Sequence, residues 1–185
     1  QITDSTRNIL ADKQQPMMIG GEHLVTLGAV RAVVEKYPDL HILHFDAHAD
    51  LRNDYLGMTL SHATVMRGVW ELVGDGKIFQ FGIRSGEKEE FAWGSEHLSM
   101  QKFNLAGLEQ VVTELQDKPV YLTIDLDVLD PGIFPGTGTP EAGGISFIEL
   151  LNAICQVGKL RIVACDMNEL APIYDQSGAS TALAC

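Results

Sequence analysis

Cysteine is scarce in this chain of 185 residues, which contains three cysteines and no two of them at the C-x-x-C spacing. This argues against a disulfide framework and against a cysteine-bound zinc site. Basic residues are also few, because 13 Lys and Arg against 25 Asp and Glu give a formal net charge of -12. Nucleic acids and anionic membranes are therefore poor partners, whereas an acidic surface would attract a cationic substrate.

Long apolar runs are missing as well. No segment approaches the roughly 18 consecutive apolar residues of a membrane-spanning helix, and the N-terminal residues do not have the pattern of a secretory signal peptide. We therefore expect a cytoplasmic protein. The 45% apolar content is enough for one hydrophobic core, and without repeats or linkers the sequence predicts a single domain over residues 1–185.

Predicted strands and helices alternate along the chain. The expected strands cover 16–19, 41–46, 78–83, 120–126 and 160–165, and the expected helices cover 24–37, 62–73, 107–115 and 146–157. Irregular loops are expected at 51–61, 84–96 and 131–144. This alternation predicts an α/β fold in which helices cover a mostly parallel sheet. Ser146 with Glu149 predicts a capping box at the start of the last helix.

Aspartate and histidine side chains follow two of these strands, at Asp46, His48 and Asp50 and again at Asp125 and Asp127. Side chains two positions apart on an extended strand share a face, so each group is expected to point one way. Carboxylates about 4 Å apart repel by about 4 kcal/mol at an effective dielectric near 20, so such a cluster needs cations. The alternative is that these aspartates are helix caps and turn residues.

A histidine follows the first predicted strand after two glycines, and this is His23. Alone it would be read as a residue at a helix N-terminus, but ligands in open parallel sheets bind beyond the carboxyl ends of the strands, where the aspartates also lie. Imidazole and carboxylate ligands without thiolate suit Mn²⁺. Six candidate ligands exceed what one ion of a structural zinc site needs, which favours two ions that share carboxylates.

Five segments of the chain occur in the order typical of the ureohydrolases, the arginase and agmatinase family, which the chain resembles from Pro16 onward. They are Gly20–His23, Asp46–Asp50, Thr123–Pro131, Gly136–Pro140 and Asp166–Glu169. The resemblance implies a three-layer α/β/α arginase-like fold with a mostly parallel sheet. It also implies that relatives extend beyond this chain, so that the domain would be incomplete at both ends.

The resemblance further implies two manganese ions. One would be held by His23, Asp46, Asp50 and Asp125, and the other by Asp46, His48, Asp125 and Asp127. Asp46 and Asp125 would bridge the two ions.

Catalytic and substrate roles also come from the resemblance. Asp50 would relay a proton to the leaving amine, His62 would shuttle protons, Glu169 would pair with a guanidinium and Thr139 would line the substrate pocket. Without the resemblance, His62 reads as a solvent-facing histidine and Glu169 as a solvated loop acid.

Among ureohydrolases the chain looks more like an agmatinase than an arginase, from residues such as Arg52, Tyr55 and Ser61-His62. We therefore expect hydrolysis of agmatine to putrescine and urea, a step in polyamine biosynthesis, by a homo-oligomer of three or six subunits. Acidic residues including Asp54 and Glu87 would receive the amine end of the substrate. The alternatives are a ureohydrolase for arginine, guanidinobutyrate or another guanidino compound, and a noncatalytic metal-binding relative.

Overall fold

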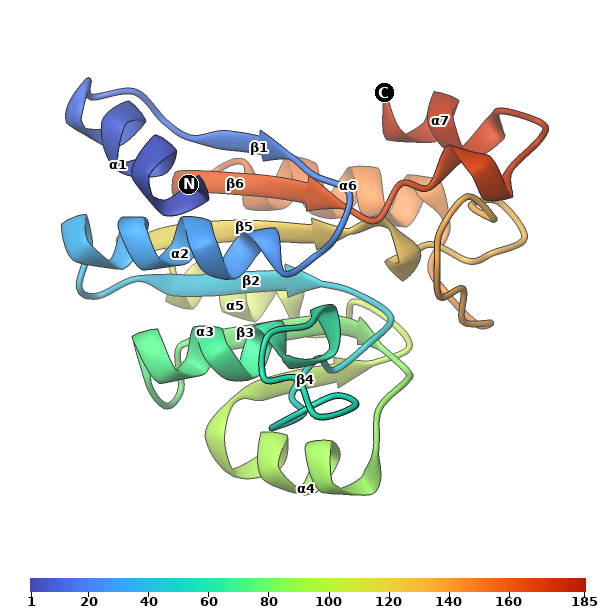
Figure 1. The fold of residues 1–185 in the computed structure, drawn as a ribbon, viewed down its shortest axis with the longest axis horizontal. Helices are drawn as coiled ribbons and strands as arrows, with labels where there is room; N and C mark the ends of the chain where they lie inside the picture. Colours follow the sequence, from blue (N-terminus) through green and yellow to red (C-terminus); the bar gives the residue numbers. More distant parts are fainter.

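The computed structural model describes residues 1–185 and contains one sheet of six parallel strands (Figure 1). The strands are β1 (Met17–Ile19), β2 (His41–Phe45), β3 (Ile78–Ile83), β4 (Ser99–Lys102), β5 (Pro119–Asp125) and β6 (Arg161–Asn168). Their order across the sheet is β1-β6-β5-β2-β3-β4. Because the strands are parallel, their carboxyl ends meet at one edge, on the right in Figure 1.

Helices cover both faces of this sheet. They are α1 (Ile2–Ala11), α2 (Val25–Lys36), α3 (Val65–Val73), α4 (Lys88–His97), α5 (Leu108–Glu114), α6 (Phe147–Val157) and α7 (Ala179–Ala184). The first three helices lie over one face, and α5 and α6 lie over the other (Figure 1). The predicted three-layer arrangement with a parallel sheet is thus confirmed. No helix has the length and apolar character needed to cross a membrane.

The two faces of the central strands contribute side chains to two separate hydrophobic cores. On β5, Val120, Leu122 and Ile124 pack into the core under α5 and α6, whereas Tyr121 packs into the core under α1 to α3. This alternation follows from the two-residue period of a strand. Burying each such apolar side chain contributes about 1.5–3 kcal/mol, so the central strands hold the sheet rigidly between two helix layers.

The prediction of an irregular loop over 84–96 is wrong, because residues Lys88–His97 form α4. Of the acidic residues that suggest a loop, Glu87 caps the helix and Glu89 and Glu90 lie in its first turn, where negative charge is favourable beside the positive end of the helix dipole. Glu90 also accepts hydrogen bonds from the backbone N–H groups of Glu87 and Leu51. The other predicted strands and helices are present with small shifts of their ends, and α1, β4 and α7 were not predicted.

Candidate metal centre

The candidate ligands lie at the carboxyl edge of the sheet, but they do not share strand faces as predicted. That expectation is wrong because β2 ends at Phe45 and β5 ends at Asp125. Beyond β2 the chain runs along the end of β3, where the backbone N–H of Ala49 donates to Ser85 O at 3.0 Å. Asp50 then adopts a positive φ of 57°. A curled loop, rather than strand alternation, brings the side chains together.

Asp125 serves both as a helix cap and as part of the cluster. Its Oδ1 accepts from the backbone N–H of Asp127 at 2.9 Å, at the start of a short 3-10 turn over Leu126–Val128. Its Oδ2 lies 3.3 Å from His23 Nδ1. The cap directs the second oxygen of Asp125 toward the histidine, so the capping role and the ligand role are compatible.

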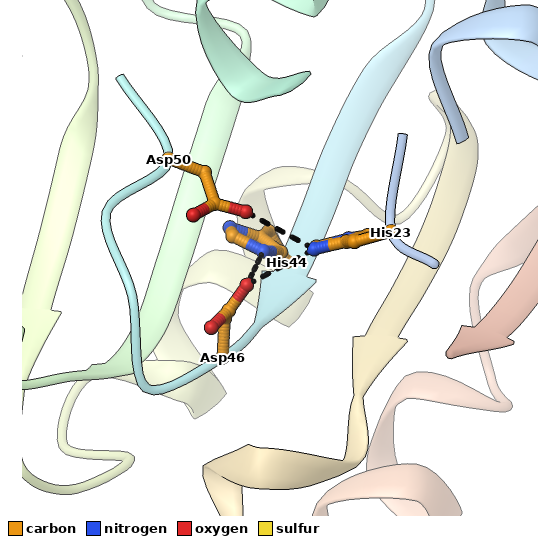
Figure 2. A group of neighbouring side chains, drawn as sticks. All are labelled: His23, His44, Asp46 and Asp50. Atoms are coloured by element: carbon orange, nitrogen blue, oxygen red, sulfur yellow. Dashed lines mark hydrogen bonds and ion pairs between the residues drawn. The ribbon is translucent and has the colours of Figure 1, made fainter. Parts of the chain in front are cut away.

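His23 Nδ1 lies among three carboxylates. It is 3.1 Å from Asp50 Oδ2 and 3.2 Å from Asp46 Oδ2, and these two residues flank it in Figure 2. A second group lies on the other side of Asp46, where His48 Nδ1 is 3.0 Å from Asp127 Oδ2 and 3.4 Å from Asp46 Oδ1. Asp46 therefore turns one oxygen toward each group and is common to both.

Burial makes this cluster of charges costly without a cation. The four aspartates are at most 6% exposed. Burial, and then the charge of Asp46, raises the pKa of Asp50 to about 7, while burial with the charges of Asp127 and Asp46 raises the pKa of Asp125 well above its usual range. Burial also opposes protonation of His48, but Asp127 and Asp46 outweigh it and raise its pKa to about 11. The metal-free cluster must therefore hold protons.

Two buried polar atoms of the cluster have no hydrogen-bond partner, namely His23 Nδ1 and Asp127 Oδ2. Buried polar groups in folded proteins nearly always have a partner, so these two atoms are suited to bind a cation. Imidazole nitrogen and carboxylate oxygen are the donors that Mn²⁺ and similar divalent ions accept. The residues present fit a divalent cation in each of the two groups.

Two small adjoining cavities open above the cluster. One of about 160 Å³ is lined by Glu22, His48, Asp50, His62, Asp125, Asp127, Gly138, Thr139 and Glu169. The other, of about 130 Å³, shares His48, Asp50, His62 and Thr139 with it. The structure thus brings the predicted residues Asp50, His62, Thr139 and Glu169 around one space beside the metal groups.

Glu169 is held in this space by backbone contacts. Its Oε1 accepts from the backbone N–H of His23 at 2.8 Å, and burial raises its pKa above the usual range. The side chain of His62 is 45% exposed, and its Nδ1 lies 3.4 Å from Glu22 Oε1.

Glu87 is not brought into the site. It does not line either cavity, and its Oε1 lies 3.1 Å from Nη1 of Arg52. Asp54 likewise lines neither cavity, and its Oδ1 accepts from the backbone N–H of Gly57.

Four buried polar residues beneath the cluster were missed by the sequence analysis. They form one row across the sheet, at paired positions of β3, β2, β5 and β6, and we call them the polar row: Gln80, His44, Thr123 and Asp166. The available signal was a polar residue inside each strand with an apolar residue directly on either side of it. His44 contacts the cluster directly, with its Nε2 2.8 Å from Asp46 Oδ2 (Figure 2). Burial lowers the pKa of His44.

Comparison with known proteins finds similar chains among agmatinases and related enzymes. The chain is 47% identical over 180 residues to the agmatinase of Bacillus subtilis (strain 168), covering 95% of this chain and 62% of that protein. It is 33% identical over 180 residues to a guanidinobutyrase of Pseudomonas aeruginosa, covering 91% of this chain and 56% of that protein. It thus spans less than two thirds of the length of either relative.

A solved structure described as a putative agmatinase from Clostridium difficile superimposes with a TM-score of 0.97 at 51% identity, covering 100% of this chain and 68% of the other. The Arginase family model matches residues 1–185. With the whole chain matched and its fold shared, the chain belongs to the arginase family.

Proposed function

We propose that this protein is a binuclear manganese hydrolase that cleaves agmatine to putrescine and urea. The observation that carries the proposal is the convergence of two histidines and four aspartates on two groups that share Asp46. In this proposal His23, Asp46, Asp50 and Asp125 hold one ion, and Asp46, His48, Asp125 and Asp127 hold the other. When bound, the ions would supply Lewis acidity and a water that ionises near neutral pH.

The chain itself would bind and orient the guanidinium group. Glu169 lines the larger of the two cavities without belonging to either metal group. Its carboxylate can pair with a planar guanidinium through charge-assisted hydrogen bonds, and binding of this cation would oppose the rise in its pKa. The reacting carbon would then be held against the metal groups, beside Asp50.

Two residues would handle protons. Asp50 lines both cavities, so its carboxylate can pass a proton to the departing amine. His62 also lines both cavities and is partly exposed, so it can exchange protons between the cavity and solvent. Both groups line the same cavity as Glu169.

The far end of the substrate favours agmatine over a carboxylate-bearing compound. Arg52 is the one arginine or lysine that lines either cavity, and it is already paired with Glu87 at 3.1 Å and Glu90 at 3.5 Å. Among the residues that line these two cavities, a substrate carboxylate would meet no free guanidinium or ammonium group, and the acidic side chains there would disfavour it. The higher identity to the Bacillus agmatinase than to the guanidinobutyrase agrees with this choice.

Steady-state kinetics of the full-length, manganese-loaded protein test the substrate. We expect kcat/KM to be highest for agmatine in a panel with arginine and 4-guanidinobutyrate. A higher value for either carboxylate-bearing compound would contradict the agmatine assignment. Turnover of none of them would contradict the hydrolase itself.

A further inference from the structure

The polar row lies beneath the candidate metal ligands, and each of its members has an apolar residue on either side of it in its strand. Gln80, His44, Thr123 and Asp166 occupy neighbouring register positions on four adjacent strands, and each is at most 3% exposed. Burying four polar side chains in a sheet is unfavourable unless each is hydrogen-bonded. The partners of these side chains therefore show what the row does.

Gln80 fixes the protonation of His44. The Nε2 atom of Gln80 lies 2.8 Å from the backbone O of Ala49 and 3.0 Å from His44 Nδ1. An atom that faces a carbonyl oxygen at this distance must be the amide nitrogen, because two carbonyl oxygens cannot bond each other. Since Gln80 donates to His44 Nδ1, that nitrogen must be bare and the ring proton must be on Nε2.

His44 is therefore a donor to Asp46 and not a metal ligand. Its Nε2 lies 2.8 Å from Asp46 Oδ2, and a protonated nitrogen has no lone pair to offer an ion. The two buried histidines near Asp46 differ in this respect. The lone pair of His23 can be directed into the cluster, whereas His44 can only hold a carboxylate in place.

Thr123 has the corresponding contact with His23. Its Oγ1 lies 3.0 Å from His23 Nε2, the ring nitrogen that points away from the carboxylates. If the Nε2 proton is donated to Thr123, the lone pair of Nδ1 is left facing Asp46, Asp50 and Asp125. Histidine ligands in metalloproteins are commonly oriented by such a contact at the other ring nitrogen.

Asp166 anchors the end of the row. Its carboxylate accepts from the hydroxyls of Tyr121 and Thr26 and from Nδ2 of Asn168, and the hydroxyl of Thr123 also stabilises its charged form. Thr123 can thus direct its own proton toward Asp166 and leave an oxygen lone pair for His23. These contacts tie this end of the row to β5, β6 and α2.

We propose that the polar row is a positioning layer that fixes the ring proton on Nε2 in both buried histidines. In His23 the bare Nδ1 then faces the carboxylates and can bind a metal ion, whereas in His44 the protonated Nε2 faces Asp46 and holds its shared carboxylate. The inference rests on the proposed metal function and goes beyond it, because it names residues that touch neither ion nor substrate. Its consequence is that metal affinity depends on hydroxyl and imidazole groups outside the ligand set.

The test is the Mn²⁺ affinity of matched variants of the full-length protein, measured from the free Mn²⁺ signal in electron paramagnetic resonance without substrate. Thr123→Val keeps the shape of the side chain and removes the hydroxyl, whereas Thr123→Ser keeps the hydroxyl. His44→Leu removes the donor, whereas His44→Gln keeps an N–H near the same position. We expect the Val and Leu variants to bind Mn²⁺ about tenfold to a hundredfold more weakly, and the Ser and Gln variants to stay near wild type.

Three results would overturn the proposal. The first is wild-type Mn²⁺ affinity in Thr123→Val. The second is loss of one bound ion in His44→Gln, which would make His44 a ligand. The third is a proton on Nδ1 of His44 in long-range ¹H–¹⁵N spectra of the metal-free wild-type protein. Because the spectrum uses the unaltered chain, a variant that fails to fold leaves the proposal testable. Mn²⁺ binding by wild type without turnover of agmatine would contradict the proposed reaction alone.

Discussion

Glu169 lines the cavity beside the metal groups without belonging to either group, which makes it the most informative single side chain for the reaction. Replacing Glu169 by Gln keeps its shape and removes its charge, so the contact with a guanidinium should weaken while the metal ligands stay in place. We predict that kcat/KM for agmatine falls by about a hundredfold, which corresponds to about 2.7 kcal/mol of transition-state stabilisation. Steady-state kinetics together with a Mn²⁺ titration measure both effects.

Glu87→Gln is a suitable control for this variant. Glu87 lines neither cavity and pairs with Arg52, so kcat/KM should remain close to the wild-type value. Equal losses in the two variants would indicate a general effect of removing negative charge. Wild-type activity in Glu169→Gln would show that Glu169 does not bind the guanidinium.

The sequence predicts the types and order of the ligand residues but not the contacts that orient them. The spacing of Asp46, His48 and Asp50 identified the cluster, although the curled loop that joins them was not foreseen. His44 and Thr123 could not be assigned a role, because their function depends on the register between β2 and β5. Register joins residues far apart in the chain, and local patterns carry little information about it.

Gly82 links the geometry of β3 to the shared carboxylate. It has a φ of 87°, and a Cβ built there would lie 3.1 Å from the backbone O of Asp46 and 2.6 Å from Val128 Cγ2. We predict that Gly82→Ala lowers the free energy of unfolding by about 1–3 kcal/mol and weakens Mn²⁺ binding, because Asp46 must shift. Denaturant unfolding and a Mn²⁺ titration measure these changes.

Gly74 provides the matched control. It has a φ of 85°, but no atom lies within 4 Å of a Cβ built at this position. Gly74→Ala should therefore show the cost of backbone strain without any change in Mn²⁺ affinity. If both variants bind Mn²⁺ like wild type, Gly82 does not support the site through Asp46.

The elements themselves were well predicted where apolar patterns were strong. The buried strands β2, β3 and β5 and the capped helix α6 are each predicted to within a residue or two at most. The segment that forms α4 was misjudged because its acidic residues and its glycine suggest a loop. Its helical state depends on contacts with the rest of the fold, such as the bond from the backbone N–H of Leu51 to Glu90, which no local pattern reveals.

The crowded charges of the cluster should couple the stability of the whole protein to pH and metal. In the metal-free fold the pKa of Asp50 is raised to about 7 and that of His48 to about 11, from ordinary values of 3.8 and 6.5. Asp50 therefore holds more protons in the folded state than in the unfolded chain between pH 3.8 and about 7, and His48 does so between pH 6.5 and about 11. Over these ranges the free energy of unfolding falls as pH rises. Asp39, whose pKa is lowered by its lysine partners, titrates below this window. His41 and His44, whose pKa values are lowered by burial, act in the opposite direction below pH 6.5, but they are outnumbered by groups with a raised pKa, which also include His23, Asp125 and Asp127.

We therefore predict that the Tm of the metal-free protein is lower near pH 8 than near pH 5, and that added Mn²⁺ raises the Tm more at the higher pH. The ions replace protons in the cluster, so they bind best where those protons are lost most easily. Thermal unfolding with and without Mn²⁺ at the two pH values measures this. An equal rise in Tm at both pH values would argue against proton displacement.

The number of Mn²⁺ ions bound per chain at saturation tests the central claim most directly. Metal analysis of the full-length protein after equilibrium dialysis should give two ions, because Asp46 turns one oxygen to each of two ligand groups. Asp127→Ala, which removes a ligand from one group, should leave the other ion bound. A wild-type protein that binds no more than one ion at saturating Mn²⁺ would contradict the binuclear centre.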